Sequence, residues 1–420
     1  MTFARQGAMA GVVLLTISVA LPAQPHYIGA GGCSSSNCHG STTPAAEGAR
    51  RILTTEYALW AIHDKHADAG KALENARSAR MAEILGLGNA ATAQRCTACH
   101  VAGSPDNNRA DGVACEACHG AAEKWLGTHT QANSHAASVQ AGMIDTKNLV
   151  VRAKVCLECH LGTAERVVDH ELIAAGHPDL PFELDTFSWA EPSHAREPAA
   201  SAGNTLPRTR VWAVGQTVRL SEGMRDLARR AETSWPDFAV LECSQCHHDL
   251  HAESWRIQRG YPGRAPGSLQ LNPAETEIVR ILVSKVAPAQ SAAFDSSLDK
   301  LTASVAKRPC DGAAIAQAAR TVEQRAGALT NQMLQTDFTK PMVRELIHAL
   351  DAQMNRISGQ GVYAAEQATM SLDSLAAAES GNDRKVQQVV GELYTYLEHP
   401  SAYNARDFAA LFRKVVQHLE

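Results

Sequence analysis

The chain has 420 residues, a formal net charge of −5, and 45% hydrophobic but only 5% aromatic residues. This length favours two domains over a single core. An acidic balance without a basic stripe argues against a nucleic-acid partner. So few aromatic residues are unusual for a chain of this size, unless a cofactor fills part of the interior.

The N-terminus has the pattern of a secretory signal. Arg5 precedes an apolar run over residues 8–21, and small residues with Pro22 follow it. Because the run is shorter than the roughly 20 apolar residues that span a bilayer, we expect a signal peptide over residues 1–23 rather than an uncleaved anchor. No later segment is apolar enough to be a candidate span. We therefore predict a periplasmic protein that carries no membrane span once the signal is removed.

Ten of the eleven cysteines lie in five motifs, and each motif is followed directly by histidine. Four motifs have the spacing Cys-x-x-Cys-His, and the first has the longer spacing Cys-x4-Cys-His. Such a motif offers two thiols to the vinyl groups of a haem and a histidine to its iron. A redox dithiol or half of a zinc site would not require the histidine in every copy. The predicted attachment pairs are Cys33 and Cys38, Cys96 and Cys99, Cys115 and Cys118, Cys156 and Cys159, and Cys243 and Cys246, with His39, His100, His119, His160 and His247 as proximal ligands.

Histidines outside the motifs are candidates for the second axial position of each iron. A second histidine closes the haem and suits it to electron transfer, whereas an open position permits substrate chemistry. His66 is placed on a predicted helix beside Trp60, and His170 and His177 flank a short apolar segment and can serve two different haems. The predicted distal ligands are His66, His129, His170, His177 and His248, followed by the weaker candidates His63, His135, His194 and His251.

The chain changes character near residue 262. Residues 24–262 hold all five motifs and few periodic stretches, which predicts a pentahaem domain of short helices and long loops packed on haems. From residue 263 onwards apolar residues recur at helical spacing. Helix starts are predicted at Asn272–Pro273, at Asp311 and at Thr339–Pro341, and two more helices flank Pro400. We predict a mainly α protein in which residues 263–420 form a helical bundle with a structural or docking role.

The order of the motifs resembles that of the cytochrome c-554 family of multihaem cytochromes over roughly residues 27–260. The resemblance implies a periplasmic electron carrier with closely packed, mostly bis-histidine haems, one of which lacks a distal protein ligand. In the family's best-known setting the electrons come from hydroxylamine oxidation. The fifth motif and the C-terminal helices depart from the family's four-haem pattern. The similar segments are Tyr27-Ile-Gly with Cys33 to Gly40, Asp64 to Ala67, Gly112 to Gly120, Ala175 to Pro178, Phe182 to Phe187, and Cys246-His-His248.

These features favour a pentahaem c-type cytochrome that transfers electrons between other redox proteins of the periplasm, with five covalently bound haems and no catalytic residue. The alternative is a multihaem reductase that acts on a small nitrogen or sulfur compound at one open haem. No motif ends in the lysine that marks the catalytic haem of related nitrite reductases, although a five-coordinate haem with a proximal histidine is still allowed. A third hypothesis, a haem-based sensor or scaffold, would require a signalling domain, and no segment has that pattern.

Overall fold

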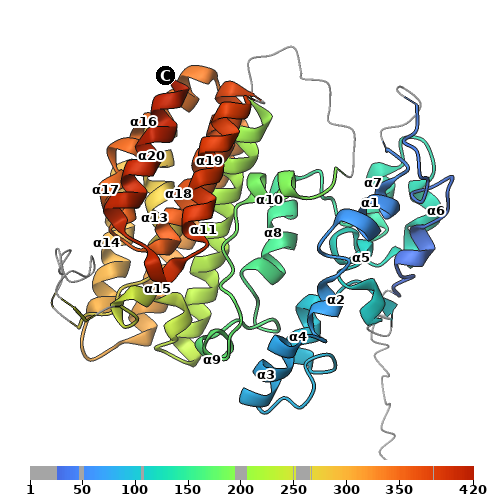
Figure 1. The fold of residues 1–420 in the computed structure, drawn as a ribbon, viewed down its shortest axis with the longest axis horizontal. Coiled ribbons are helices and arrows are strands. Elements are labelled where there is room, and N and C mark those ends of the chain that lie inside the picture. The colour runs from blue at the N-terminus through green and yellow to red at the C-terminus, as the bar shows by residue number, and fades with distance from the viewer. Residues whose placement is uncertain are drawn as a thin grey trace, which may run out of the picture.

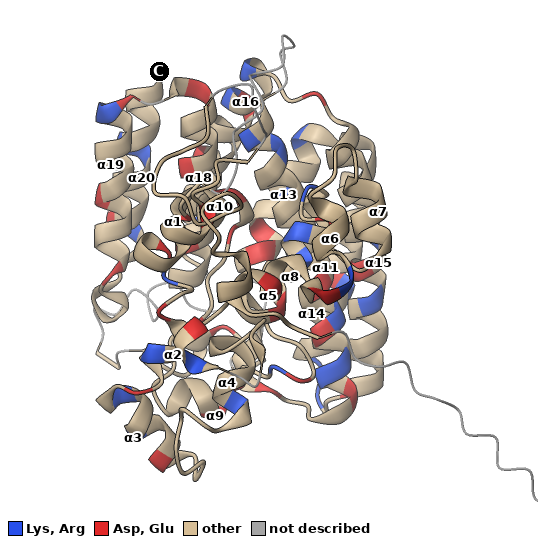
Figure 2. Ribbon diagram, turned by 90° about the vertical axis from the view of Figure 1, so that its right-hand side faces the viewer, with Lys and Arg blue, Asp and Glu red and all other residues tan. Residues whose placement is uncertain are grey.

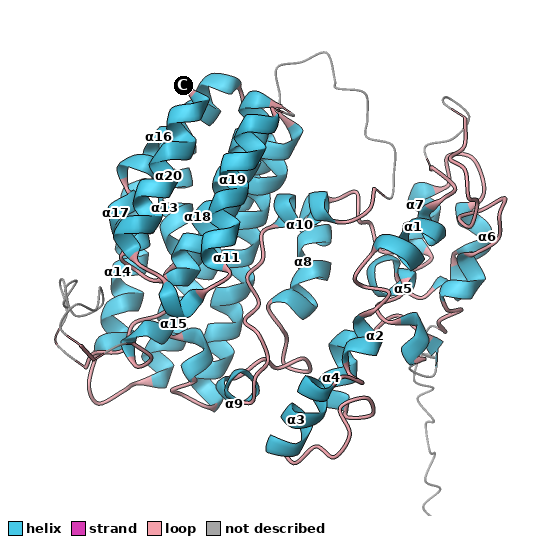
Figure 3. Cartoon of the chain, viewed as in Figure 1, coloured by secondary structure: helices cyan, strands magenta, loops and turns pink. Residues whose placement is uncertain are grey.

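The computed structural model describes residues 26–46, 52–105, 108–193, 206–248, 250–251, 265, 267–381 and 383–420. The predicted signal peptide, His194 and the predicted boundary at residues 262 and 263 lie outside these ranges. Within them the secondary structure is helical (Figure 3), and β structure is limited to one isolated antiparallel bridge between Leu241 and Leu271. The predicted mainly α class is therefore confirmed.

Short helices joined by long loops form the part of the chain before residue 193, and those that precede α8 lie on one side of the molecule (Figure 1). Their local hydrophobic clusters are small, and one of them has only Ala30, Trp60, Ala67 and Ala114 as buried members. The elements are η1 (Ala30–Cys33), α1 (Glu56–His63), α2 (Ala69–Ala72), α3 (Ala76–Ile84), α4 (Gln94–His100), η3 (Arg109–Asp111), α5 (Cys115–His119), η4 (Ala122–Lys124), α6 (Leu126–His129), α7 (His135–Gln140), α8 (Leu149–His160), α9 (His170–Ala174) and α10 (Leu184–Ala190).

Longer helices form a bundle on the other side, and α8 and α10 lie between the two parts (Figure 1). One large hydrophobic cluster extends through the bundle and reaches Leu157 of α8 and Leu184 of α10. The elements are α11 (Pro207–Thr233), η5 (Phe238–Val240), η6 (Cys243–Gln245), α13 (Ala274–Val286), α14 (Pro288–Ala306), α15 (Gly312–Gln335), α16 (Lys340–Ala352), α17 (Met354–Ser358), α18 (Val362–Ser380), α19 (Arg384–Leu397), η7 (Pro400–Ala402) and α20 (Ala405–Leu419).

The predicted helix starts in the bundle agree with the structure. Asp311 is the N-cap of α15 and accepts the backbone N–H of Ala314 at 3.0 Å. At α13 the start differs by one residue, because Pro273 is the N-cap rather than the first helical residue. There Asn272 accepts the backbone N–H of Ala274 at 3.0 Å. The helices expected on either side of Pro400 are α19 and α20.

Helix α11 belongs to the bundle although it precedes the predicted boundary. It packs along α15 and also contacts α13 and α18. Trp212, Val214, Val218 and Leu220 are buried in the shared hydrophobic cluster. The core of the C-terminal helices thus includes a segment that the sequence assigned to the haem domain. The division of the chain into two domains at residue 262 stays a prediction.

The surface carries charges of both signs. Figure 2 shows basic and acidic residues interspersed over the helices of one face, and ion pairs such as Arg280–Asp295 and Arg344–Glu379 link neighbouring helices. Among the described residues, no helix combines the length and the apolar character needed to cross a bilayer.

Candidate haem-binding sites

Three of the five attachment motifs lie at the end of a helix. Helices α4, α5 and α8 each end at the motif histidine, so the two cysteines and the histidine occupy positions i, i+3 and i+4. Residues at this spacing share one face of a helix, which brings both thiols and the imidazole to the same side. All eleven cysteines are free thiols, so the motif pairs are available for thioether bonds.

Four motif histidines each face a second histidine from a distant part of the chain. In every case the second histidine is one of the predicted distal ligands. The distances between ring centroids are 6.3 Å for His39–His129, 6.3 Å for His100–His177, 6.3 Å for His160–His66 and 6.2 Å for His247–His170.

These separations suit two imidazoles that bind opposite sides of one iron. A ring nitrogen binds a first-row metal at about 2 Å, and the ring centre lies roughly 1 Å behind that nitrogen, so the two centroids should be roughly 6 Å apart. A direct hydrogen bond of about 2.9 Å between ring nitrogens would instead bring the centroids to roughly 5 Å. The interplanar angles range from 13° to 87°, which is compatible because each ring can rotate about its bond to the metal. The four histidine pairs therefore fit a six-coordinate haem iron.

The Nδ1 atoms of most of these histidines have their own hydrogen-bond acceptors. Such partners fix Nδ1 as the donor and leave Nε2 for the metal. His129 Nδ1 donates to the carbonyl oxygen of Leu126. The other contacts are His39–Glu56 at 3.1 Å, His66–Asp64 at 3.0 Å, His100 to the carbonyl oxygen of Ala69 at 3.0 Å, and His177 to that of Pro178 at 2.7 Å.

The environment of His160 keeps its imidazole neutral, the form that binds a metal. Burial, and then the charges of His66 and Arg219, lower the pKa of His160 to about 4. Phe182 and Phe187 pack against the ring, with centroids 5.2 and 5.3 Å from it. For His66, the hydrogen bond that its Nδ1–H donates to the Asp64 carboxylate raises the pKa against the opposing effect of burial. A carboxylate in that position makes the imidazole a more basic ligand.

The first and third attachment motifs contact each other. The Cys33 thiol lies within hydrogen-bonding distance of the Cys115 thiol. Glu116, a buried residue inside the third motif, accepts the backbone N–H groups of Ile28 and Gly29 at 2.8 to 3.1 Å. This carboxylate fixes the segment that leads into the first motif beside the third.

The second and fourth motifs are joined in the same way. The thiols of Cys99 and Cys159 lie within hydrogen-bonding distance. Arg166 donates to the carbonyl oxygen of Ala98, inside the second motif, at 3.0 Å and also binds Glu158, inside the fourth. Sequence reasoning did not identify Glu116 or Arg166, because their partners are distant in sequence.

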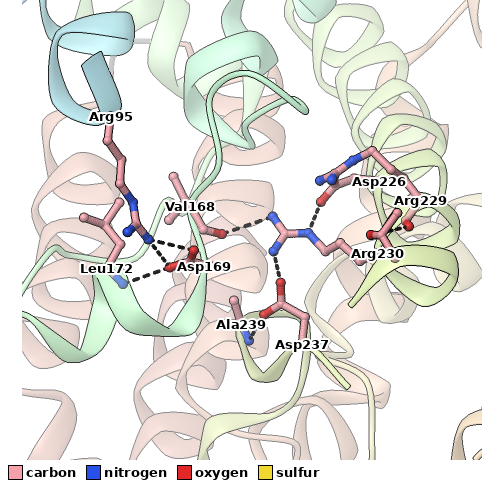
Figure 4. Close-up of polar contacts among 10 residues, drawn as sticks. Arg95, Val168, Asp169, Leu172, Asp226, Arg229, Arg230, Asp237 and Ala239 are labelled. Carbon is pink, nitrogen blue, oxygen red and sulfur yellow. Dashed lines mark hydrogen bonds and ion pairs between the residues drawn. The ribbon is translucent and has the colours of Figure 1, made fainter. Parts of the chain in front are cut away.

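The segment that carries His170 and His177 is fixed from both sides (Figure 4). Asp169 accepts the backbone N–H of Leu172 at 2.9 Å and binds Arg95, the residue before the second motif, at 2.6 and 2.7 Å. On the side of the bundle, Arg230 of α11 donates to the carbonyl oxygen of Val168 at 3.1 Å. Its side chain is 4% exposed and pairs with Asp226 and Asp237. Helix α9 is thereby held between the second motif and α11.

His66 lies in the turn after α1 and not on a helix as predicted. The Asp64 side chain accepts the backbone N–H of His66 at 2.9 Å, a local bond that ends the helical pattern. His63 is the last residue of α1 and is exposed.

The remaining histidines have varied surroundings. His135 Nε2 is 3.0 Å from Asp145, and His251 is exposed. His248 is half-buried beside His247, and its assignment as a distal ligand stays a prediction. His119 ends α5, and the sequence assigned it no particular distal partner.

Comparison with protein families gives a match to part of the chain. Residues 33–120 match the model of the family described as cytochrome c554 and c-prime. This segment holds the first three motifs, and the predicted resemblance to the cytochrome c-554 family is confirmed there. A cytochrome c family implies covalently bound haem c and electron transfer. Searches of the curated proteins and of the solved structures found no match.

Proposed function

We propose that the chain is a periplasmic pentahaem c-type cytochrome that passes electrons between other redox proteins. The observation that carries this proposal is the placement of four motif histidines opposite four distant histidines at 6.2 to 6.3 Å. The two imidazoles of each pair would hold one haem iron between them and would leave no position on it for a substrate. A haem of this kind is suited to electron transfer rather than to catalysis.

When bound, haem supplies the one-electron chemistry, and the residues of the chain hold it in place. The histidines of each pair would hold the haem iron, and Glu56 and Asp64 orient His39 and His66 through their Nδ1 atoms. Because these rings are positioned by the fold, little rearrangement is needed when an electron arrives. The buried Phe182 excludes water around His160.

Contacts between motifs support a continuous route for electrons. The first motif touches the third through Cys33 and Cys115, and the second touches the fourth through Cys99 and Cys159. Cys118 of the third motif interacts electrostatically with the fourth. Helix α9 then connects this group with the fifth motif, since His177 faces the second motif and His170 faces the fifth.

Low-temperature EPR of the oxidised protein tests the proposed function, because it separates low-spin from high-spin haems. We expect at least four low-spin signals, one for each histidine pair. A high-spin haem that binds nitrite or sulfite and reduces it with turnover would favour the reductase instead. Fewer than four low-spin haems would contradict the ligand pairs on which the proposal rests.

Haem stoichiometry is the second expected result. Mass spectrometry of the mature protein should show five covalently bound haems, and the Cys33→Ser/Cys38→Ser variant should carry one fewer because it lacks both thiols of the first motif. Cys310→Ser is the matched control and should retain all five, since Cys310 is exposed and lies outside every motif. Four haems in the unchanged protein would show that the Cys-x4-Cys-His motif is not used.

A further inference from the structure

A cavity of about 120 Å³ lies between the bundle, the segment just before the fifth motif, and His160 of the fourth motif. Val168 and Ile173 line it from the segment that carries His170, and Val240 lines it from just before the motif. Helix α18 contributes Tyr363, Glu366 and Gln367 to its lining. The cavity is therefore bordered by His160 of the fourth motif, and Tyr363 links it to the fifth motif through Cys243.

The fifth motif is anchored on the bundle by side chains. Tyr363 Oη lies 3.6 Å from Cys243 Sγ. Gln245, inside the motif, donates to the carbonyl oxygen of Gln270 at 2.8 Å and accepts its N–H at 2.9 Å. Gly361, at the start of α18, has a φ of 126°, and a Cβ there would lie 2.6 Å from Glu242 Oε1. The fifth motif therefore lies close to α18, and a change of charge on a haem attached there would act on residues of this helix.

Two of the residues that line the cavity have buried oxygens without a hydrogen-bond partner. Gln367 is 2% exposed, and its Nε2 donates to the carbonyl oxygen of Phe182 at 2.9 Å while its Oε1 has no partner. Glu366 Oε2 is likewise buried and unpaired. A buried carboxylate without a counter-charge is strongly disfavoured, whereas a protonated carboxyl gains an O–H donor.

The two arginines that line the cavity pair with carboxylates other than Glu366. Arg219 pairs with Glu275 at 2.7 Å, and Arg230 pairs with Asp226 and Asp237. Asp179 adds a further carboxylate and bonds Tyr363, and His160 is held neutral by burial. Burial, and then the charge of Asp179, raise the pKa of Glu366 to about 7.

We propose, on the basis of the proposed electron transfer, that Glu366 binds a proton when the haem held by Cys243 and Cys246 accepts an electron, and releases it when that electron leaves. The electron comes from a redox protein, the proton comes from solvent, and both depart on oxidation. The bond made and broken is the O–H bond of the Glu366 carboxyl. Added negative charge in a region of low dielectric favours the neutral carboxyl.

The sign of the pH dependence follows from these charges. Well below pH 7, Glu366 is protonated in both redox states, and reduction takes up no proton there. Above pH 7 it is ionised in the oxidised protein, and reduction raises its pKa, so a proton binds. In that range the midpoint potential of the fifth haem should fall with rising pH by up to about 59 mV per pH unit.

Proton uptake on full electrochemical reduction of the whole protein at pH 8 tests the proposal. Glu366→Gln should take up fewer protons than the unchanged protein, by up to one per chain. Glu345→Gln, an exposed carboxyl of α16, should match the unchanged protein. Equal uptake by the Glu366→Gln protein and the unchanged protein would overturn the proposal.

Redox titrations followed by EPR at several pH values identify the haem involved. The midpoint potential that falls with rising pH should belong to the low-spin signal that is missing in the His170→Ala protein. In the Glu366→Gln protein this potential should no longer depend on pH. A slope on another signal, or none at all, overturns the assignment to the fifth haem. If all the haems were low-spin and no midpoint potential changed with pH, this inference alone would be refuted. Catalytic turnover at a high-spin haem would refute only the proposed function.

Discussion

We expect the His177→Ala protein to contain one high-spin haem that binds carbon monoxide, while the other haems keep their low-spin spectra. His177 faces His100 with a centroid distance of 6.3 Å. Its backbone is fixed by Arg77, which donates to the carbonyl oxygen of Gly176 at 3.0 Å. Imidazole supplies the strong axial field, and alanine leaves water or nothing in its place. EPR and the carbon monoxide difference spectrum measure the change.

His348→Ala is the control for this substitution, because His348 is exposed on α16 of the bundle. Its spectra should equal those of the unchanged protein. If the EPR spectrum of His177→Ala were also unaltered and only one potential drifted, His177 would be a residue at a haem edge and not a ligand. The second axial position of the His100 haem would then need another donor.

A Trp212→Ala substitution should lower the free energy of unfolding by about 3–5 kcal/mol. Trp212 is 1% exposed in the second turn of α11 and lies in the hydrophobic cluster shared with α13, α15 and α18. Removing the indole leaves a cavity that the surrounding helices cannot fully close. Urea unfolding followed by far-ultraviolet circular dichroism gives the difference.

Trp189→Ala provides the comparison with another tryptophan. Trp189 is 59% exposed, and the Arg208 guanidinium lies 4.5 Å from its ring centroid. Losing such a cation–π contact at an exposed site costs about 0.5–1 kcal/mol. Equal losses in the two variants would show that α11 does not carry the packing between the short helices and the bundle.

The sequence by itself determined the attachment motifs and much of the secondary structure. Two cysteines and a histidine within one helical turn reach one side of a cofactor without help from the rest of the chain, as in α4, α5 and α8. Capping at Asp311 and the amphipathic patterns of α16, α19 and α20 are likewise local. These features were predictable because the residues that produce them are neighbours in sequence.

Helices α11 and α18 show what local patterns could not reveal. α18 is buried around most of its circumference, so it has no polar face to mark it as an amphipathic helix. In α11 the buried positions include Arg219 and Arg230, whose charges are compensated by Glu275, Asp226 and Asp237. In a sequence, a buried arginine cannot be distinguished from a surface arginine, because the sequence does not show which acidic residue pairs with it.

The histidine pairs were decided by tertiary structure alone. His66 and His129 could be proposed as ligands from their surroundings. The residues around a histidine do not show, however, which other histidine would bind the same iron. His66 lies opposite His160, and His170 lies opposite His247, only because the fold brings together segments that are separated by very different lengths of chain. The contact between Cys243 and Tyr363 spans 120 residues in the same way. Ligand type depends on the residue itself, whereas ligand pairing depends on distances in space that only the folded chain defines.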